Sequence, residues 1–263
     1  MKLEAEGIAQ GYGPHCVIKD VGFTAESGEL LTILGPNGCG KSTLIKTLCG
    51  VIPPKAGTVT VDGRDLLAMD PKEMAKLVAY VPQTIGTAGH STVYDLVLIG
   101  RRPYVEWSYT HEDLEIAAQA MIDMNVNAYS GINIENLSGG QRQRAFIARA
   151  LAQRPSFYVF DEPTSSFDLR NQQDTMRIMK KLTRERESCL VVALHDLNLA
   201  IRYSDKVMVL HNGSVYDIGK PEDVITPKMI MDVYGVSAEI MEDRHGLFVR
   251  AYDDGNDRVA DRA

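Results

Sequence analysis

The sequence predicts an α/β fold in which a parallel sheet carries a phosphate-binding loop. Three observations support this: a glycine-rich segment at 35–43 follows the apolar run 30–34, a second apolar run at 157–160 ends in two acids, and residues 156–210 alternate strand and helix patterns. Strands that alternate with helices favour a parallel sheet. A length of 263 residues is compatible with one domain, and we expect a single domain, 1–263. The chain lacks an apolar run of about 18 residues or more, so we expect no membrane-spanning helix.

The first half of the chain supplies the flank, the loop and most of the helices. Residues 1–30 predict short strands with polar turns, which would form an antiparallel flank, and the N-terminus does not resemble a signal peptide. Residues 31–83 hold the glycine-rich loop, a helix at 41–49 that ends at Gly50, and further strands. Residues 84 to about 155 are mostly helical, with helices expected at 93–100, 112–124 and 141–153.

The second half continues the sheet and then forms a hairpin. Residues 156 to about 210 predict strand, helix, strand, helix and strand. Residues 206–210 and 215–218 flank Asn212-Gly213, which is a strong signal for a two-residue hairpin turn. Residues 253–263 are polar and acidic, and we expect a loose tail there.

The glycine-rich segment fits the phosphate-loop pattern G-x-x-x-x-G-K-[ST], between a strand and a helix as that motif requires. Glycines let backbone N–H groups converge on an anion, and the N-terminus of the following helix adds a partial positive charge. Lys41 would reach the terminal phosphates, and the Ser42 hydroxyl would bind Mg²⁺, which prefers oxygen ligands. The candidate nucleotide-binding residues of the loop are Gly35, Pro36, Asn37, Gly38, Cys39, Gly40, Lys41, Ser42 and Thr43.

Two acids follow the apolar run 157–160. In a doubly wound sheet, the carboxyl end of a buried strand faces the ligand crevice. Asp161 would therefore hold Mg²⁺, directly or through water. Glu162 would polarise the attacking water, because catalysis of phosphoryl transfer depends mainly on positioning and charge stabilisation. The alternative is that both carboxylates only cap the following turn.

The pentapeptide Leu137-Ser138-Gly139-Gly140-Gln141, called the signature below, lies between these two motifs. With the phosphate loop, the Asp161-Glu162 strand and His195, in this order and spacing, the chain resembles the nucleotide-binding subunit of an ATP-binding-cassette (ABC) transporter over nearly its whole length. The resemblance implies an α/β fold: a P-loop NTPase core with a parallel sheet, an antiparallel β flank and a helical signature subdomain at about 84–155. It also implies ATP hydrolysis, with ATP and Mg²⁺ as cofactors.

The resemblance further implies a head-to-tail dimer, in which the signature of one copy closes over ATP held by the phosphate loop of the other. The signature would offer the Ser138 hydroxyl, the N–H groups of Gly139 and Gly140, and the positive end of the helix that starts at Gln141. It would thus be a second anion site supplied in trans. Asp168 would help to couple the two sites.

Three further positions match the family one at a time. Tyr12 matches the aromatic residue that stacks on adenine. Gln83 matches the glutamine that touches Mg²⁺ and the attacking water, and His195 matches the histidine that contacts the γ-phosphate. On the residues alone, they could be a turn tyrosine, a loop glutamine and a strand-end cap. The implied catalytic residues are Glu162, His195, Lys41 and Gln83, and the implied Mg²⁺ ligands are Ser42, Gln83 and Asp161.

Segments 92–104, 194–200, 203–205 and 233–236 resemble importers of iron-siderophore, haem and cobalamin chelates. This likeness implies polytopic membrane permease subunits as partners, a substrate-binding protein that acts through the permease, and a peripheral location on the cytoplasmic face of the cell membrane. Residues 92–104 would line the groove for a permease helix, or else form an amphipathic helix packed on its own core. Alternatives are an importer of molybdate or tungstate and a soluble non-transport cassette such as the iron-sulfur assembly ATPase.

Charge and cysteine usage exclude other classes. The net charge is −7 and the sequence has no block of lysines and arginines, which argues against a nucleic-acid partner. The four cysteines lack C-x-x-C spacing, so we expect reduced thiols rather than a disulfide framework or a metal site.

Overall fold

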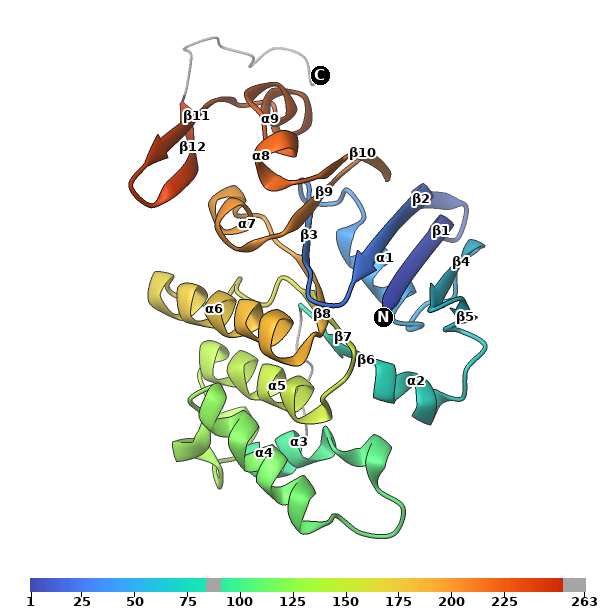
Figure 1. Cartoon of the computed structure of the whole chain (residues 1–263), viewed down its shortest axis with the longest axis vertical. Coiled ribbons are helices and arrows are strands. Elements are labelled where there is room, and N and C mark those ends of the chain that lie inside the picture. The colour runs from blue at the N-terminus through green and yellow to red at the C-terminus, as the bar shows by residue number, and fades with distance from the viewer. Residues whose placement is uncertain (84–90, 253–263) are drawn as a thin grey trace.

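The computed structural model describes residues 1–83 and 91–252, so the predicted loose tail at 253–263 lies outside the described residues. Its centre is a six-stranded sheet in the order β10-β9-β3-β8-β7-β6 (Figure 1). Neighbours from β9 to β6 are parallel, and β10 pairs antiparallel with β9. The strands are β3 (Leu30–Leu34), β6 (Val78–Val81), β7 (Phe157–Asp161), β8 (Cys189–Ala193), β9 (Lys206–His211) and β10 (Ser214–Gly219).

The central strands are apolar on both faces because the sheet separates two hydrophobic clusters. In β7, Tyr158 and Phe160 point into one cluster, whereas Phe157 and Val159 point into the other. All five residues of this strand are buried. A strand covered on both faces has a continuous apolar sequence, which explains the runs that predicted the parallel sheet.

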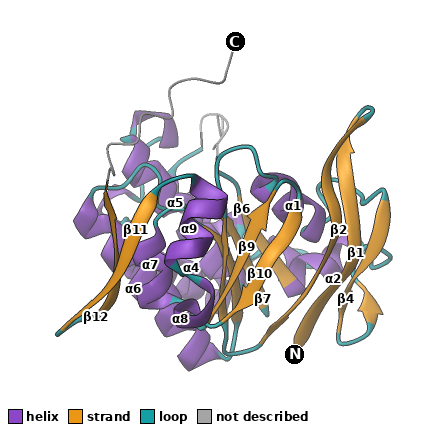
Figure 2. Cartoon of the chain, turned by 90° about the horizontal axis from the view of Figure 1, so that it is seen from above, coloured by secondary structure: helices purple, strands orange, loops and turns teal. Residues whose placement is uncertain are grey.

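The flank is a second sheet in the order β2-β1-β4-β5, on the side of the core that also holds α1 (Lys41–Leu48) (Figure 2). The prediction of an antiparallel flank is confirmed, but the prediction of short strands is wrong. The two N-terminal strands have 11 and 12 residues. The pairing between them contains register shifts, and at these points the regular alternation of apolar and polar residues is interrupted. The strands are β1 (Lys2–Tyr12), β2 (His15–Glu26), β4 (Ala56–Val61) and β5 (Arg64–Asp65).

The opposite face of the central sheet is covered by helices. The three helices predicted between 93 and 153 are confirmed within two residues at each end, and α5 begins earlier than predicted because Ser138 caps it and Gly139 is already helical. Thr92, Thr110 and Ser138 each form a capping box. The elements are α3 (Val93–Ile99), η1 (Arg102–Tyr104), α4 (His111–Asp123), η2 (Asn127–Tyr129), η3 (Ile134–Asn136), α5 (Gly139–Gln153), α6 (Leu169–Arg186) and α7 (Leu197–Tyr203). The helix α2 (Pro71–Leu77) lies on the other side, where Met74 and Leu77 pack against the cluster that contains α1.

The chain continues past the predicted hairpin into elements that were not predicted. The hairpin itself is confirmed, since Asn212 and Gly213 have φ of 51° and 82° between β9 and β10. Asn198 of α7 then pairs with the backbone of Val249, accepting its N–H at 2.7 Å. In the described ranges, no helix is both long and apolar enough to cross a membrane. The additional elements are α8 (Pro221–Val224), α9 (Pro227–Tyr234), β11 (Ser237–Asp243) and β12 (Gly246–Tyr252).

A buried ion pair holds η1 against α4 and α5. The Arg101 guanidinium donates to Asp113 at 2.8 Å and to the carbonyl of Ala152 at 2.9 Å. We expect Asp113→Ala to lower the free energy of unfolding by about 3–5 kcal/mol, because it leaves a buried arginine unpaired. Urea denaturation measures this change. Glu115→Ala removes an exposed carboxylate of the same helix and should change stability by less than about 0.5 kcal/mol; equal losses would contradict the assignment.

Candidate nucleotide site

The phosphate loop joins β3 to α1 through three glycines with positive φ: 148° at Gly35, 80° at Gly38 and 111° at Gly40. Gly40 is the N-cap of α1. The side chain of Lys41 folds back over the loop, and its Nζ donates to the carbonyls of Gly35 at 2.8 Å and Pro36 at 3.2 Å. The lysine ammonium is thus buried at the start of α1, next to the space that the loop surrounds.

Gly35 has no room for a side chain. A Cβ there would lie 2.3 Å from the carbonyl oxygen of Leu210 and 2.7 Å from the Cys39 sulfur. We expect Gly35→Ala to lower the free energy of unfolding by more than about 2 kcal/mol, since strain from the positive φ adds to the clash. Thermal and urea unfolding test this. In the control Gly38→Ala, the new Cβ would meet no atom within 4 Å, so this variant has only the strain from its positive φ. An equal loss of unfolding free energy in both variants would refute the steric explanation.

The two acids that follow the β7 run have different surroundings. Asp161, the last residue of β7, is 1% exposed and accepts a hydrogen bond from the Ser42 hydroxyl at 3.0 Å. Burial raises the pKa of Asp161, and neighbouring Glu162 raises it further, while the bond from Ser42 opposes both. No cation forms an ion pair with Asp161 among the residues that the structure describes.

Glu162 is held at the centre of a polar cluster. Its backbone has a φ of 51°, an unusual conformation for a glutamate, and its side chain is buried. Its carboxylate accepts a hydrogen bond from Gln83 Nε2 at 2.5 Å, lies 3.1 Å from His195 Nδ1, and lies 3.7 Å from Lys41 Nζ. The structure therefore brings together the four side chains that were predicted to be catalytic.

These residues line one pocket of about 580 Å³. Tyr12 is half-exposed at the end of β1 and lines the pocket together with the loop, Gln83, Glu162 and His195. Val17 and Ser165 also line it and were not predicted; Val17 is an ordinary residue of β2, and no motif marks it. The lining residues are Tyr12, Val17, Asn37, Gly38, Gly40, Lys41, Ser42, Thr43, Gln83, Glu162, Ser165 and His195.

The signature and Asp168 are not among the lining residues of this pocket. Ser138 accepts a hydrogen bond from Gln141 N at 3.3 Å, and Gln141 accepts one from Ser138 N at 2.9 Å. Asp168 caps α6 by accepting a single hydrogen bond from Asn171 N at 2.8 Å. The ring of Phe167 lies beside Gly140, where a Cβ would be 3.5 Å from it, so this buried ring supports the start of α5. In one chain, the signature helix start is therefore formed but is not part of the pocket.

A phosphate loop after the buried strand β3, with an acid pair at the end of β7 on the other side of β8, defines an ATP-binding protein of the phosphate-loop class. Residues 18–165 match the ABC transporter family. The chain belongs to this family and corresponds to its ATP-hydrolysing subunit.

Relatives and solved structures agree with this assignment. An uncharacterised ABC transporter ATP-binding protein of Methanocaldococcus jannaschii is 40% identical, over 91% of this chain and 94% of its own length. A hemin import ATP-binding protein of Thermobifida fusca is 38% identical, over 91% and 84%. A solved chain from an inward-facing transporter described as metal-chelate type superposes with a TM-score of 0.81 at 25% identity, covering 96% of this chain and 98% of that one.

Proposed function

We propose that this chain is the ATPase subunit that energises a membrane importer of a metal chelate of the iron-siderophore, haem or cobalamin type. The hemin import relative and the metal-chelate type neighbour support this class of cargo. One observation supports the ATPase role most directly: the pocket gathers Tyr12, the phosphate loop, Gln83, Glu162 and His195 around one space.

The roles follow from the position of each group. Tyr12 stacks on the base, the loop and Lys41 hold the phosphates, and Glu162 orients the attacking water. His195 and Gln83 position Glu162, since both contact its carboxylate.

The residues at the end of β7 fit Mg²⁺. Asp161 is a buried carboxylate that accepts a hydrogen bond from one hydroxyl and forms no ion pair among the described residues, so it is suited to a hard divalent cation. Ser42 and Asp161 would hold the ion, with Gln83 as a further oxygen ligand. When bound, Mg²⁺ neutralises charge on the phosphates of ATP.

The position of the signature supports a head-to-tail dimer. Ser138, Gly139, Gly140 and Gln141 form an ordered helix start, and none of them lines the pocket of its own chain. In the dimer that we propose, they close the pocket of the second copy, and Asp168 couples the two sites. Binding of two ATP closes the dimer because the closed state binds ATP better, and hydrolysis reopens it.

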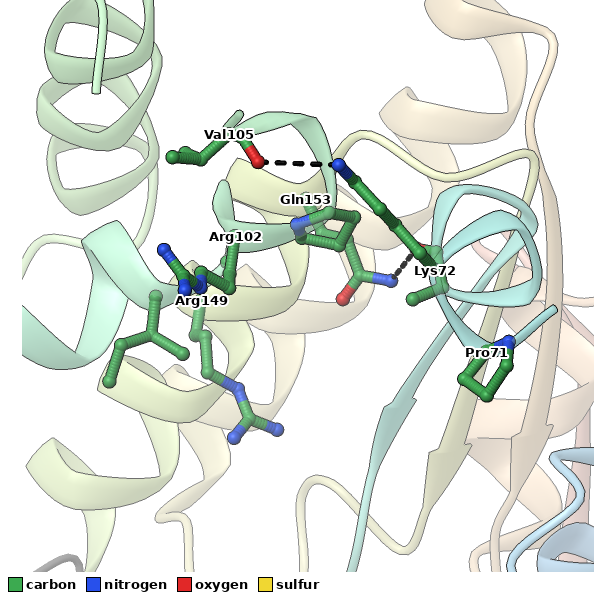
Figure 3. Close-up of a pocket in the computed structure, with 10 residues that line it drawn as sticks. Pro71, Lys72, Arg102, Val105, Arg149 and Gln153 are labelled. Carbon is green, nitrogen blue, oxygen red and sulfur yellow. Dashed lines mark hydrogen bonds between the residues drawn. The ribbon is translucent and has the colours of Figure 1, made fainter. Parts of the chain in front are cut away.

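Membrane permease subunits and, through them, a substrate-binding protein complete the proposed assembly, which places the chain on the cytoplasmic face of the cell membrane. We also propose that 1–263 is one cassette with a helical subdomain at about 84–155. In segment 92–104, Val93, Leu96 and Val97 are buried in the chain's own core, which supports the interpretation as a helix packed on that core. Ile99, Gly100, Arg102 and Pro103 line a surface pocket (Figure 3), and the contact of this segment with a permease helix is part of the proposal.

Affinity purification of the chain from detergent-solubilised native membranes, followed by mass spectrometry, tests this proposal. We expect a polytopic membrane subunit in an amount equal to that of the chain. Recovery of soluble partners alone would instead support a cassette of the iron-sulfur assembly type and would refute the import function. Recovery of a membrane subunit together with a molybdate- or tungstate-binding protein would support the transport function but show that the cargo is molybdate or tungstate.

A further inference from the structure

The hairpin that carries Tyr12 extends beyond the strand that supports it. The pairing of β1 with β4 ends at Ala9 and Ala56, whereas β1 and β2 remain paired as far as Tyr12 and His15. The hairpin lies next to α1, the helix that follows the phosphate loop (Figure 1). Its end is tight, since a Cβ on Gly11 would lie 1.9 Å from the carbonyl oxygen of His15. Side chains must therefore hold this end in place, because no third strand pairs with it.

Lys55 ties the tip of this hairpin to the segment before β4. Its Nζ donates a hydrogen bond to the carbonyl of Gly13 at 2.7 Å, and its backbone N–H donates to the carbonyl of Ala9 at 2.9 Å. Gly13 directly follows Tyr12. Lys55 is exposed, does not line the nucleotide pocket, and forms no ion pair in residues 1–83 and 91–252. Its ammonium group therefore contacts the hairpin and not the space for ATP.

Gln10 makes a second tie, from inside the hairpin. It is 3% exposed, and both ends of its side-chain amide have a partner. Oε1 accepts a hydrogen bond from the N–H of Gly11 at 2.6 Å, and Nε2 donates to the carbonyl of Pro53. A buried amide is costly unless its donor and acceptor are both satisfied. This side chain therefore fixes where Gly11 lies relative to Pro53.

The segment that receives both ties is itself fastened to α1. The N–H groups of Val51 and Ile52 donate to the carbonyl of Lys46 at 2.9 and 3.3 Å, and Lys46 lies in the last turn of α1. Residues 53 and 54 are both prolines, whose fixed φ stiffens the connection. A continuous series of bonds thus runs from the helix of the phosphate loop to the hairpin that carries Tyr12.

We propose that Lys55 and Gln10 are positioning residues for the base of ATP, which fix the distance between Tyr12 and the phosphate loop. The proposal rests on the proposed function, in which Tyr12 stacks on the base, and it adds the residues that place this ring. Tyr12 is half-exposed, so its own packing does little to hold it. Stacking depends on the spacing and orientation of the two rings. A ring that is held in place before ATP arrives therefore binds the base with a smaller loss of entropy.

The test is Lys55→Met in the purified full chain, with two probes: ATP, and inorganic tripolyphosphate, which has no base. We expect the Kd for ATP to rise about threefold or more and the Kd for tripolyphosphate to stay unchanged. In turnover, the KM for ATP should rise while kcat at saturating ATP keeps its wild-type value. Lys55→Arg retains a donor and should keep most of the affinity. Gln10→Glu cannot donate to the carbonyl of Pro53 and should weaken ATP binding in the same way.

Two controls separate the placement of Tyr12 from other effects. Lys19→Met makes the same charge change at an exposed residue of β2 outside the pocket and should bind both probes as the wild type does. In a Tyr12→Ala background, Lys55→Met should cause no further loss of ATP affinity, because it acts through Tyr12.

Four results would overturn the proposal. They are an unchanged Kd for ATP in Lys55→Met, an equal rise of the Kd for both probes, an equal effect of Lys19→Met, and a further loss in the Tyr12→Ala background. Tyr12→Ala by itself tests the proposed function separately. If it binds ATP as tightly as the wild type, the stacking role of Tyr12 is wrong and this inference fails with it.

Discussion

Glu162→Gln is expected to reduce the turnover number for ATP hydrolysis about a hundredfold or more while ATP binding stays intact. The glutamine keeps the size of the side chain and can still accept the hydrogen bond from Gln83, but it cannot accept a proton from the attacking water. It also removes a negative charge 3.7 Å from Lys41, next to the site for the phosphates. The variant should therefore accumulate as an ATP-bound dimer, which size-exclusion chromatography with ATP and Mg²⁺ detects.

A matched control is available in the same chain. Glu187 also has a positive φ, at 50°, but it is exposed at the C-cap of α6 and does not line the nucleotide pocket. Glu187→Gln should hydrolyse ATP at the wild-type rate and dissociate after turnover. If Glu162→Gln hydrolysed ATP at nearly the wild-type rate, the role assigned to Glu162 would be wrong.

The core sheet was predictable because its strands are buried on both faces and their sequences are continuously apolar. The N-terminal strands were predicted too short, since their register shifts place polar residues where a regular strand alternates. The C-terminal α8, α9 and the β11–β12 hairpin were missed for a different reason. The strands β11 and β12 are only partly buried, with an irregular pattern, so they lack the alternation that marks a strand in sequence. The helix α8 has only four residues, whereas α9 carries helical signals, with Thr226 as its N-cap and Met229, Ile230 and Val233 on one buried face, and could have been predicted from them.

The site was predictable where a motif fixes local geometry, as in the phosphate loop and the signature helix. The convergence of Gln83 and His195 on Glu162 could be stated only through family resemblance, because nothing local in a loop glutamine indicates a partner 79 positions away. Val17 was missed because it reaches the pocket only through the packing of β2 against the phosphate loop, which the sequence does not reveal. This packing is close, since a Cβ added at Gly40 would lie 3.3 Å from the Val17 side chain.

Ser138→Arg should abolish hydrolysis and leave ATP binding by the monomer unchanged. Ser138 does not line the pocket of its own chain, so its replacement removes nothing that holds ATP there. In the proposed dimer, however, a bulky arginine would stand where the signature meets the phosphates of the second copy. Loss of the cap adds only about 1 kcal/mol of destabilisation. Thr226→Arg removes the cap of α9 and so controls for the destabilisation that loss of a helix cap causes. This variant should keep full activity. Loss of monomer ATP binding in Ser138→Arg would show that the signature acts within its own chain.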